Sequence, residues 1–345
     1  MTEHISPSGS TVAEAEAFLA AHPEIEAFDI VLHDANGIGR GKIIRRHELL
    51  SMFKAGRHLP ISILGLDICG EDVHETGLIW DEGDGDRRAW PVPGSLRAIH
   101  ASQPPRGEVL MCVYELDGAP MSSDPRHALQ RQVDAMAAEG LYPAGAFELE
   151  FFLLEAGKGK PKIARGLNSG EQPQFNEVYS LREMEDFKPF FDDLYAACDV
   201  QGIPLESAIS EYAPGQFELT LRHKADALRA TDDALMYKRL VKGVAARHGM
   251  IASFMAKPFA AQAGSGMHLH ISMNDKQGKN AFASEDPAGT PLLRQAVGGM
   301  LSTLLDSLLM FCPNANSYRR FQTNSYAPLA ATWGVDNRTV SLRVP

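Results

Sequence analysis

Three short segments of the sequence alternate carboxylate or imidazole side chains with large apolar side chains. The polar members of these segments are Glu148, Glu150, Glu211, Glu218, His268 and His270. Side chains two positions apart in a strand point to the same face of a sheet, so Glu148 and Glu150 would lie about 7 Å apart. Two carboxylates this close in an apolar segment repel each other unless a cation lies between them. We therefore predict that the three segments are strands that meet at a divalent metal ion.

The types of these side chains indicate which metal the site would bind. Carboxylate oxygens and imidazole nitrogens suit the hard or borderline ions Mg²⁺ and Mn²⁺, whereas softer metals favour thiolates. No cysteine lies in the three segments. For one glutamate pair alone, an ordinary strand with two solvated side chains is the commoner explanation. The repetition of the pattern favours a site for Mg²⁺ or Mn²⁺.

Arginines are concentrated near the end of the sequence. They are Arg319, Arg320, Arg338 and Arg343. Arginines on one side of a substrate and a carboxylate–metal cluster on the other are what transfer of a phosphoryl group from a nucleotide requires. For any one of these arginines, surface charge or pairing with a carboxylate is the alternative. The sequence has no glycine motif of the Walker or kinase type, so the hypothesis rests on the arginines and the metal together.

Composition narrows the class of protein. The chain has 345 residues, of which 44% are hydrophobic and 22% charged, as is typical of a soluble globular protein with two domains. The net charge of −11 argues against nucleic acid as a partner, since binding phosphates requires clustered Lys and Arg. No apolar run is long enough to span a membrane, and the first residues do not resemble a signal peptide. Four cysteines without a C-x-x-C pair favour reduced thiols and a cytoplasmic location.

The first part of the chain is predicted to form a small mixed α+β domain. Its expected elements are a helix at 12–21, a hairpin of strands 28–32 and 41–44, and strands at 61–66 and 109–116. The hairpin is predicted because Asn36 and Gly37 form a strong turn signal between two extended segments. The acidic, aromatic stretch at 80–86 is either a solvated turn or a region that attracts cations.

A second domain is expected to begin near Asp124. Asp124 before Pro125 is typical of a helix start, and Gly140 is typical of a helix end. Further helices are expected at about 183–201, 226–248 and 289–310, and a further strand at 251–255. The sequence therefore predicts a sheet, antiparallel or curved, with one polar face and an opposite face backed by helices. We place the two domains at residues 1–118 and 119–345.

Five motifs occur in a fixed order in the sequence. They are E-x-E at 148–150, E-x-x-P-G-Q-x-E at 211–218, K-P followed by G-S-G-M-H-x-H-x-S at 257–272, N-S-Y-x-R at 316–320, and N-R-x-x-x-x-R-x-P at 337–345. Together they resemble the glutamine synthetase superfamily, and the match extends from about Phe28 onward. The resemblance implies an α+β fold with a small β-grasp-like N-terminal domain and a catalytic domain with a curved antiparallel sheet backed by helices. It also implies a ring-shaped homo-oligomer in which the N-terminal domain of one subunit completes the active site of its neighbour.

By this resemblance, the protein would bind two metal ions, Mg²⁺ or Mn²⁺, next to ATP. Glu150, Glu211 and Glu218 would hold one ion, and Glu148 with His268 would hold the other. The residues implied in substrate binding are Arg320 and Gly264 for glutamate, Arg338 and Arg343 for the transferring phosphate, His270 and Ser272 for ATP, and Asp67, from a neighbouring subunit, for the attacking amine. The implied enzyme is an ATP-dependent glutamate–amine ligase, in which an amine displaces phosphate from γ-glutamyl phosphate.

Three features depart from the pattern of glutamine synthetases. Ala263 replaces an asparagine beside the glutamate site, and Tyr326 replaces the glutamate of the active-site flap. Since a phenol is uncharged at neutral pH, Tyr326 cannot attract ammonium, but it can line a slot for an alkyl chain. Both departures resemble the γ-glutamylpolyamine synthetase-like members, so we expect a polyamine or another primary amine as the nucleophile. The chain also reaches Pro345 before a later arginine and metal glutamate of the family, and we expect the natural chain to continue.

Two alternatives to this function stay open. An ordinary glutamine synthetase would use ammonia, and Tyr326 in the flap argues against it. A non-catalytic assembly protein of the same family would tolerate the loss of metal ligands, whereas this chain keeps every ligand position that it covers. The sequence leaves the identity of the amine open.

Overall fold

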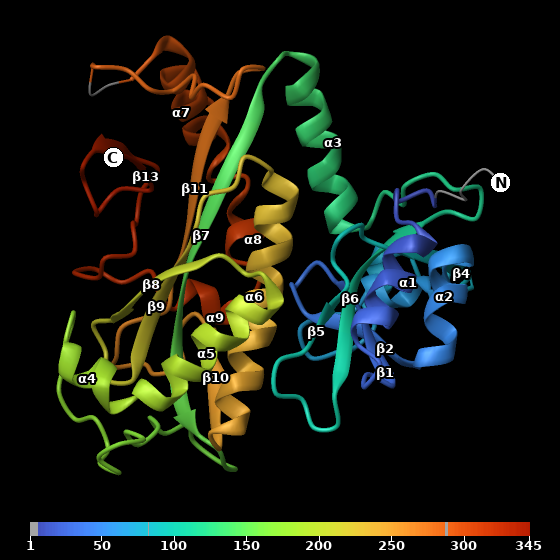
Figure 1. Ribbon diagram of the computed structural model, residues 1–345. Coiled ribbons are helices and arrows are strands. Elements are labelled where there is room, and N and C mark those ends of the chain that lie inside the picture. Colours follow the sequence, from blue (N-terminus) through green and yellow to red (C-terminus); the bar gives the residue numbers. More distant parts are fainter. Residues whose placement is uncertain (1–5, 82, 287–288) are drawn as a thin grey trace. The chain divides into compact units, whose positions relative to one another are not determined.

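The structure is a computed structural model that describes residues 6–81, 83–286 and 289–345 (Figure 1). The chain folds into two compact units. The N-terminal unit consists of the residues up to Asp134 together with Ala196–Gly202, and the C-terminal unit consists of Ala135–Tyr195 and Ile203–Pro345. The domain boundary between residues 118 and 119 that the sequence suggested stays a prediction.

The N-terminal unit contains a mixed sheet and the helices α1 (Val12–Ala21) and α2 (Arg46–Ala55). The strands of the sheet are β1 (Ala27–His33), β2 (Gly39–Arg45), β3 (Arg57–Pro60), β4 (Asp86–Pro91), β5 (Arg97–Ala98) and β6 (Arg106–Tyr114). The strand order is β2-β1-β6-β4-β3, with β5 paired to β6. The predicted first helix and the antiparallel hairpin of β1 and β2 are confirmed, and Phe28 and Phe53 lie fully buried in the core.

The predicted strand at 61–66 is wrong. Ile61–Leu64 form a 3₁₀ helix that follows the short strand β3. Ile61 and Leu64 are both buried, and a spacing of three puts two side chains on one side of a 3₁₀ turn. The apolar side chains of this segment therefore reach the core from one side of a helical turn, and not from alternate positions of a strand. The acidic stretch that follows ends in β4, a strand that the sequence pattern did not predict; Glu82 in this stretch lies outside the described residues.

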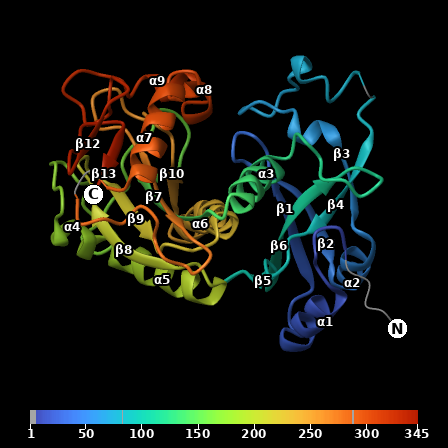
Figure 2. The ribbon, with the colours of Figure 1, turned by 90° about the horizontal axis from the view of Figure 1, so that it is seen from above.

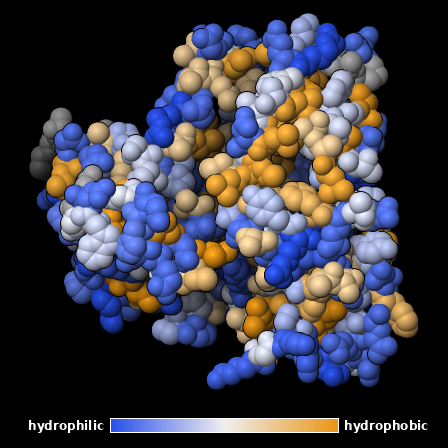
Figure 3. Space-filling model, turned by 180° about the vertical axis from the view of Figure 1, so that it is seen from behind, coloured by the Kyte–Doolittle hydropathy of each residue, from blue (hydrophilic) through white to orange (hydrophobic). Residues whose placement is uncertain are grey.

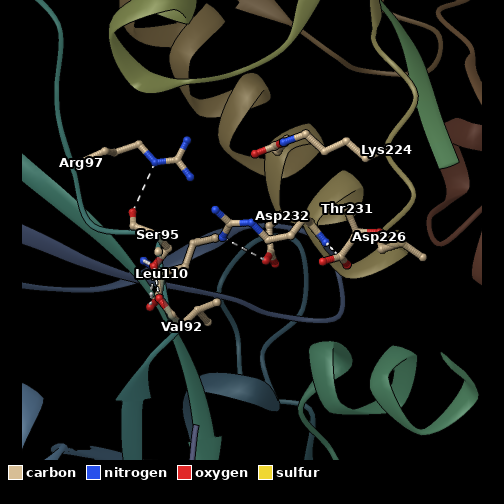
Figure 4. Close-up of polar contacts among 12 residues, drawn as sticks. Val92, Ser95, Arg97, Leu110, Lys224, Asp226, Thr231 and Asp232 are labelled. Carbon is tan, nitrogen blue, oxygen red and sulfur yellow. Dashed lines mark hydrogen bonds and ion pairs between the residues drawn. The ribbon is translucent and has the colours of Figure 1, made fainter. Parts of the chain in front are cut away.

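Buried polar contacts tie the returning segment Ala196–Gly202 into the N-terminal unit. Arg97 donates from Nε to the carbonyl of Ser95 (3.3 Å; Figure 4) and from Nη1 to the carbonyl of Gln201 (3.0 Å). The Ser95 hydroxyl donates to the Val92 carbonyl (2.6 Å) and accepts from the Leu110 amide (3.1 Å). Since a buried polar group is costly without a partner, these bonds allow polar residues within the core of this unit.

The C-terminal unit is built on a curved antiparallel sheet backed by helices, as predicted. Its strands are β7 (Tyr142–Glu155), β8 (Leu205–Ser210), β9 (Gln216–Leu221), β10 (Met250–Ser253) and β11 (Met267–Asn274). They pair in the order β10-β7-β9-β8 (Figure 2), and β11 pairs with the first half of β7 (Figure 1). A small parallel pair, β12 (Trp333–Val335) and β13 (Leu342–Val344), lies near the end of the chain. The long strand β7 therefore connects all the strands that carry the predicted ligands.

The helices of the second half begin close to their predicted positions, but two of them are shorter. They are α3 (Pro125–Ala138), α4 (Leu181–Asp186), α5 (Lys188–Gln201), α6 (Ala227–Arg247), α7 (Pro291–Thr303), α8 (Leu308–Phe311) and α9 (Ala315–Tyr318). The helix expected at 183–201 is broken at Phe187, because Pro189 cannot donate within a helix and fits only in a first turn. The helix expected at 289–310 ends at Thr303, whose hydroxyl donates to the carbonyl of Gly299 (3.0 Å) and so competes with the backbone ladder.

The α6 helix begins at a well-formed cap. The Asp226 carboxylate accepts a hydrogen bond from the amide of Arg229 (3.0 Å), and the Thr231 hydroxyl donates to the carbonyl of Ala227 (2.8 Å; Figure 4). An N-cap carboxylate satisfies a free amide of the first turn and interacts favourably with the helix dipole. This helix packs along β7 and β10 and forms part of the helical backing of the sheet (Figure 1).

Aromatic side chains fill the back of this sheet. The ring of Phe151 in β7 lies 6.3 Å from that of Phe190 in α5 and 5.3 Å from that of Phe254. The ring centroid of Phe217 in β9 lies 5.2 Å from that of Phe187 and 5.1 Å from that of Phe191. Because side chains alternate along a strand, burying Phe151 and Phe217 on this side directs their neighbours Glu150 and Glu218 to the opposite face.

Part of the surface of the C-terminal unit is apolar. Seen from behind, apolar side chains gather over this unit (Figure 3). Strongly exposed apolar residues of the segment that includes α8 are Leu305, Leu309, Met310 and Phe311. Among the described residues, the helices include none that combines the length and apolar character needed to cross a membrane.

Candidate active site

The register of the antiparallel sheet brings the predicted ligands together. Glu150 in β7 is directly opposite Glu218 in β9, and Glu148 in β7 is directly opposite His268 in β11. Directly opposed residues share a face and have Cβ atoms about 5 Å apart. Three strands therefore present four ligand-type side chains on the face away from the aromatic core.

Glu211 joins this group from the turn between β8 and β9. Its amide donates to the carbonyl of Gln216 (2.8 Å), which closes the turn. Gly215 adopts a φ of +68°, a conformation that favours glycine. The buried carboxylate of Glu183 accepts hydrogen bonds from the Gly215 amide (2.7 Å) and the Ser210 hydroxyl, and so holds both ends of the turn. Sequence reasoning missed Glu183, because nothing in its own helix marks it as buried.

The side chains form two overlapping clusters with the composition of metal sites. One consists of Glu150, Glu211 and Glu218, the other of Glu148, Glu218 and His268, and in each the ligand atoms lie within 4.8 Å of one another. Oxygen ligands with one imidazole suit Mg²⁺ or Mn²⁺, so the residues fit the predicted ions. The sequence motifs assigned Glu218 to the first ion only. The pairing of Glu150 with Glu218 places Glu218 in both clusters, and this follows from the register.

His268 and Glu148 form a close ionic pair. His268 Nδ1 lies 2.9 Å from Glu148 Oε2 and 3.6 Å from Glu218 Oε2. His270 Nε2 lies 3.1 Å from Glu148 Oε1, an ion-pair distance without hydrogen-bond geometry. The hydrogen bond with Glu148, followed by that with Glu218, raises the pKa of His268 to about 10. The same bond from His268, followed by the contact with His270, lowers the pKa of Glu148 well below its ordinary range.

The pKa values of Glu211 and Glu150 shift in the opposite direction, upward. Burial raises the pKa of Glu211 to about 7, and the negative charges of Glu150 and Glu218 add to this effect. Burial also raises the pKa of Glu150, although the Gly266 amide, 2.9 Å from its Oε2, favours the charged form. Mutual repulsion of buried carboxylates is the condition that a divalent cation relieves. The electrostatics thus agree with the ligand geometry.

Arg320 lies beside this face, against the loop that precedes β11. A Cβ atom at Gly264 would lie 2.8 Å from Arg320 Cγ, and one at Gly266 would lie 3.0 Å from both Arg320 Nη2 and Glu150 Oε1. Arg320 Nε is buried and has no hydrogen-bond partner within the described residues. The two glycines therefore allow a guanidinium with a free donor to lie next to the metal cluster. The structure brings Arg320, Gly264 and the predicted metal ligands together.

The segment that carries Arg320 is held by Asn316 of α9. Asn316 Oδ1 accepts from the Lys257 amide (2.7 Å), and Asn316 Nδ2 donates to the Lys257 carbonyl (3.0 Å). The K-P and N-S-Y-x-R motifs are thus joined by a two-point contact. This contact explains in physical terms why the two motifs occur together, because the asparagine of one fixes the backbone of the other.

The remaining predicted residues are distributed as follows. His270 and Ser272 lie on the same face of β11 as His268, by alternation. Arg338 is exposed in the connection from β12 to β13. Arg343 lies in β13, with its Nη2 atom 4.0 Å from Asp336 Oδ1. Tyr326, in the segment before β12, is 75% exposed. Their roles in binding stay predictions.

Asp67 belongs to the N-terminal unit. Its carboxylate accepts hydrogen bonds from the amides of Cys69 (2.7 Å) and Glu71 (2.9 Å). The bond from Glu71 is the main reason why the pKa of Asp67 is lowered. Asp67 is therefore held as an anion in a fixed turn, and its predicted role towards an amine stays a prediction.

Comparison with known proteins identifies the family. Residues 122–345 match the family model of the glutamine synthetase catalytic domain. The chain belongs to the glutamine synthetase family. The family resemblance read from the five motifs is thereby confirmed.

Relatives within the glutamine synthetase family include ligases that use amines. The chain is 39% identical over 337 residues to γ-glutamylputrescine synthetase of Escherichia coli K12, covering 96% of this chain and 71% of that protein. It is 34% identical to γ-glutamylethanolamide synthetase of Streptomyces coelicolor, with the same coverage of both chains. Among solved structures, a GmaS/ADP complex matches with a TM-score of 0.81 and 27% identity, covering 95% of this chain and 73% of that one.

Proposed function

We propose that the protein is an ATP-dependent ligase that joins the γ-carboxylate of glutamate to a primary amine through γ-glutamyl phosphate. The observation that carries this proposal is the pair of carboxylate clusters sharing Glu218, with Arg320 packed beside them. The family and the amine-using relatives support the same reaction class. ATP, glutamate and a small amine are the proposed substrates.

The two clusters are proposed to hold two Mg²⁺ or Mn²⁺ ions. Glu150, Glu211 and Glu218 would hold one, and Glu148, Glu218 and His268 the other. When bound, such ions neutralise the charge of the nucleotide phosphates. The chain itself contributes rigidity, because the ligands stand on paired strands and need little rearrangement.

The arginines and the loop before β11 are proposed to bind the anionic substrates. The free Nε donor of Arg320 can bind a carboxylate of glutamate, and the Gly264 backbone leaves room for the substrate. Arg338 and Arg343 would hold the transferring phosphate, while His270 and Ser272 would face ATP. These assignments follow the family motifs, and each can be tested by substituting the residue.

Tyr326 and Asp67 are proposed to act on the amine. The exposed phenol of Tyr326 can cover an alkyl chain and exclude water from the acyl phosphate. Asp67, offered by the N-terminal unit of a neighbouring subunit in a ring-shaped homo-oligomer, would attract the cationic amine. We propose a cytoplasmic enzyme, without nucleic acid or membrane as a partner.

A panel of nucleophiles tests this proposal. The full-length protein is given ATP, glutamate and Mg²⁺, and phosphate release is measured with putrescine, ethanolamine, isopropylamine and ammonia. Each buried methylene contributes about 0.8 kcal/mol of binding that ammonia lacks, so at least one primary amine should exceed ammonia in kcat/KM by about tenfold, which is 1.4 kcal/mol. Equal or better turnover with ammonia would favour an ordinary glutamine synthetase. No release with any nucleophile would favour a non-catalytic assembly protein.

A further inference from the structure

Gln216, the first residue of β9, has a fully buried side chain whose amide nitrogen donates only to residues of the candidate active site. The residue is 1% exposed. Its Nε2 donates to Glu150 Oε2 (3.0 Å) and to the Gly264 carbonyl (3.1 Å), and its Oε1 accepts from the Ala213 amide (3.2 Å). A primary amide has two N–H donors and a carbonyl acceptor, so these three partners use both ends of the group.

The two acceptors of Gln216 belong to different parts of the site. Glu150 Oε2 is a carboxylate oxygen of the first metal cluster, and it also accepts from the Gly266 amide at 2.9 Å. The Gly264 carbonyl belongs to the residue against which Arg320 packs. One amide group thus joins a metal carboxylate to the backbone of the proposed glutamate site. A fixed Nε2 leaves Glu150 Oε1 as the oxygen with fewer hydrogen bonds.

The main chain of Gln216 orients a second ligand. Its carbonyl accepts from the Glu211 amide (2.8 Å), and its amide donates to the Ala213 carbonyl (3.0 Å). Glu218 follows two positions later on the same face of β9. Gln216 therefore contacts Glu150 through its side chain and Glu211 through its backbone, and it begins the strand that carries Glu218.

We propose that Gln216 is a positioning residue that couples the first metal cluster to the glutamate site. Its Nε2 atom fixes both the carboxylate plane of Glu150 and the carbonyl of Gly264. A displacement of either acceptor therefore displaces the other through this amide. The part of this inference that concerns glutamate rests on the proposed function, whereas the part that concerns Glu150 rests on geometry alone. A glutamate at position 216 would lack the donors and add a further negative charge beside Glu150.

Two substitutions separate the loss of the donors from the added charge. Gln216→Met removes the donors without adding charge, and Gln216→Glu keeps the shape and the Oε1 acceptor. Mn²⁺ affinity of the full-length protein is measured by calorimetry without substrates, and the KM values for glutamate and ATP are measured with Mg²⁺. We expect Gln216→Met to weaken Mn²⁺ binding and raise the KM for glutamate, each by about fivefold to tenfold. The KM for ATP should change by less than twofold. A general loss of structure would raise the KM values for glutamate and ATP together.

Gln130→Met is the matched control. Gln130 is a half-buried glutamine of α3 whose Nε2 donates to Asp134 Oδ1 (2.8 Å), a residue of neither cluster. Its loss should leave both Mn²⁺ affinity and the KM for glutamate unchanged. If Gln216→Met melts far below the wild type, Gln216→Asn, which keeps a neutral amide but draws its donors back by one methylene, decides the same comparison without adding charge.

The outcomes distinguish this inference from the proposed function. Wild-type-like Mn²⁺ affinity in the deciding Gln216 variant would overturn the positioning role. Weakened Mn²⁺ binding with an unchanged KM for glutamate would overturn the coupling. If the wild type releases no phosphate with any amine, the proposed function fails, while the calorimetric comparison still tests whether Gln216 positions Glu150.

Discussion

Substituting Gly264 with alanine tests whether the loop before β11 shapes the glutamate site. The added Cβ would lie 2.7 Å from the Ala256 carbonyl oxygen and 2.8 Å from Arg320 Cγ, both well inside ordinary van der Waals contact. The carbonyl is backbone and accepts the Ser265 amide at 2.9 Å, so relieving the first contact shifts the loop itself, and relieving the second moves the side chain of Arg320. Overpacking of this kind costs about 1–3 kcal/mol. If this free energy is lost from glutamate binding because Arg320 is displaced, the KM for glutamate should rise about 5-fold to 150-fold.

The assay is steady-state phosphate release at varied glutamate, with a thermal melt of each variant as a check on folding. Gly243→Ala in α6 is the control, because a Cβ there has no atom within 4 Å and alanine should stabilise the helix by about 0.5–1 kcal/mol. It should leave the KM for glutamate unchanged. A Gly264→Ala protein whose KM for glutamate stays within twofold of the wild-type value would refute the reasoning, because Arg320 would then tolerate the added methyl group.

Three further predictions concern charge. Burial raises the pKa of Glu211 to about 7 in the metal-free protein. The contribution of Glu211 to the free energy of unfolding is therefore present at low pH and lost as pH rises through about 7. Without metal, Glu211→Gln should melt at a higher temperature than the wild type at about pH 8 but not at about pH 4. Tyr326→Glu should lower the preference for a primary amine over ammonia by about tenfold in kcat/KM, since a carboxylate attracts ammonium. Burial, together with the Lys242 ammonium, lowers the pKa of Lys238, so Lys238→Met should raise the melting temperature by about 2 °C, measured by calorimetry at pH 7.

Each of these predictions has a contradicting result. An equal change in melting temperature at pH 4 and pH 8 would show that Glu211 is not a costly anion in the metal-free fold. An unchanged ratio of the two nucleophiles would remove Tyr326 from amine selection. A lower melting temperature for Lys238→Met would mean that the Lys238 ammonium stabilises the fold, with its 5.6 Å approach to the Phe254 ring as the first candidate cause.

Local patterns in the sequence predicted those parts of the site that depend on single elements. Alternation along one strand was sufficient to place Glu148 and Glu150 on one face, and cap and turn residues located α3 and the first hairpin. Register is different, because it is set by pairing between strands far apart in the chain. The pairing of Glu150 with Glu218, which makes Glu218 a member of both clusters, could not be read from either segment alone.

Other misses have equally local physical causes. Pro189 divides a helix whose apolar pattern looks continuous, and a spacing of three in Ile61–Leu64 satisfies the core through a turn instead of a strand. Gln216 lies inside one of the five motifs, yet its contribution depends on where Glu150 and Gly264 meet in space. Residues that act through two distant partners are the ones that a pattern along the chain does not reveal.

If the two proposed ion sites are occupied, the shared carboxylate of Glu218 makes them thermodynamically dependent on each other. A first ion that draws Glu218 towards itself changes the ligand set that remains for the second ion, so the two binding free energies contain a common coupling term. A titration of this protein with Mn²⁺ should therefore not follow the curve of two independent sites. Substitution of Glu218 cannot retune one site alone, whereas substitutions of Glu211 or His268 change one ligand set directly and reach the other only through that coupling.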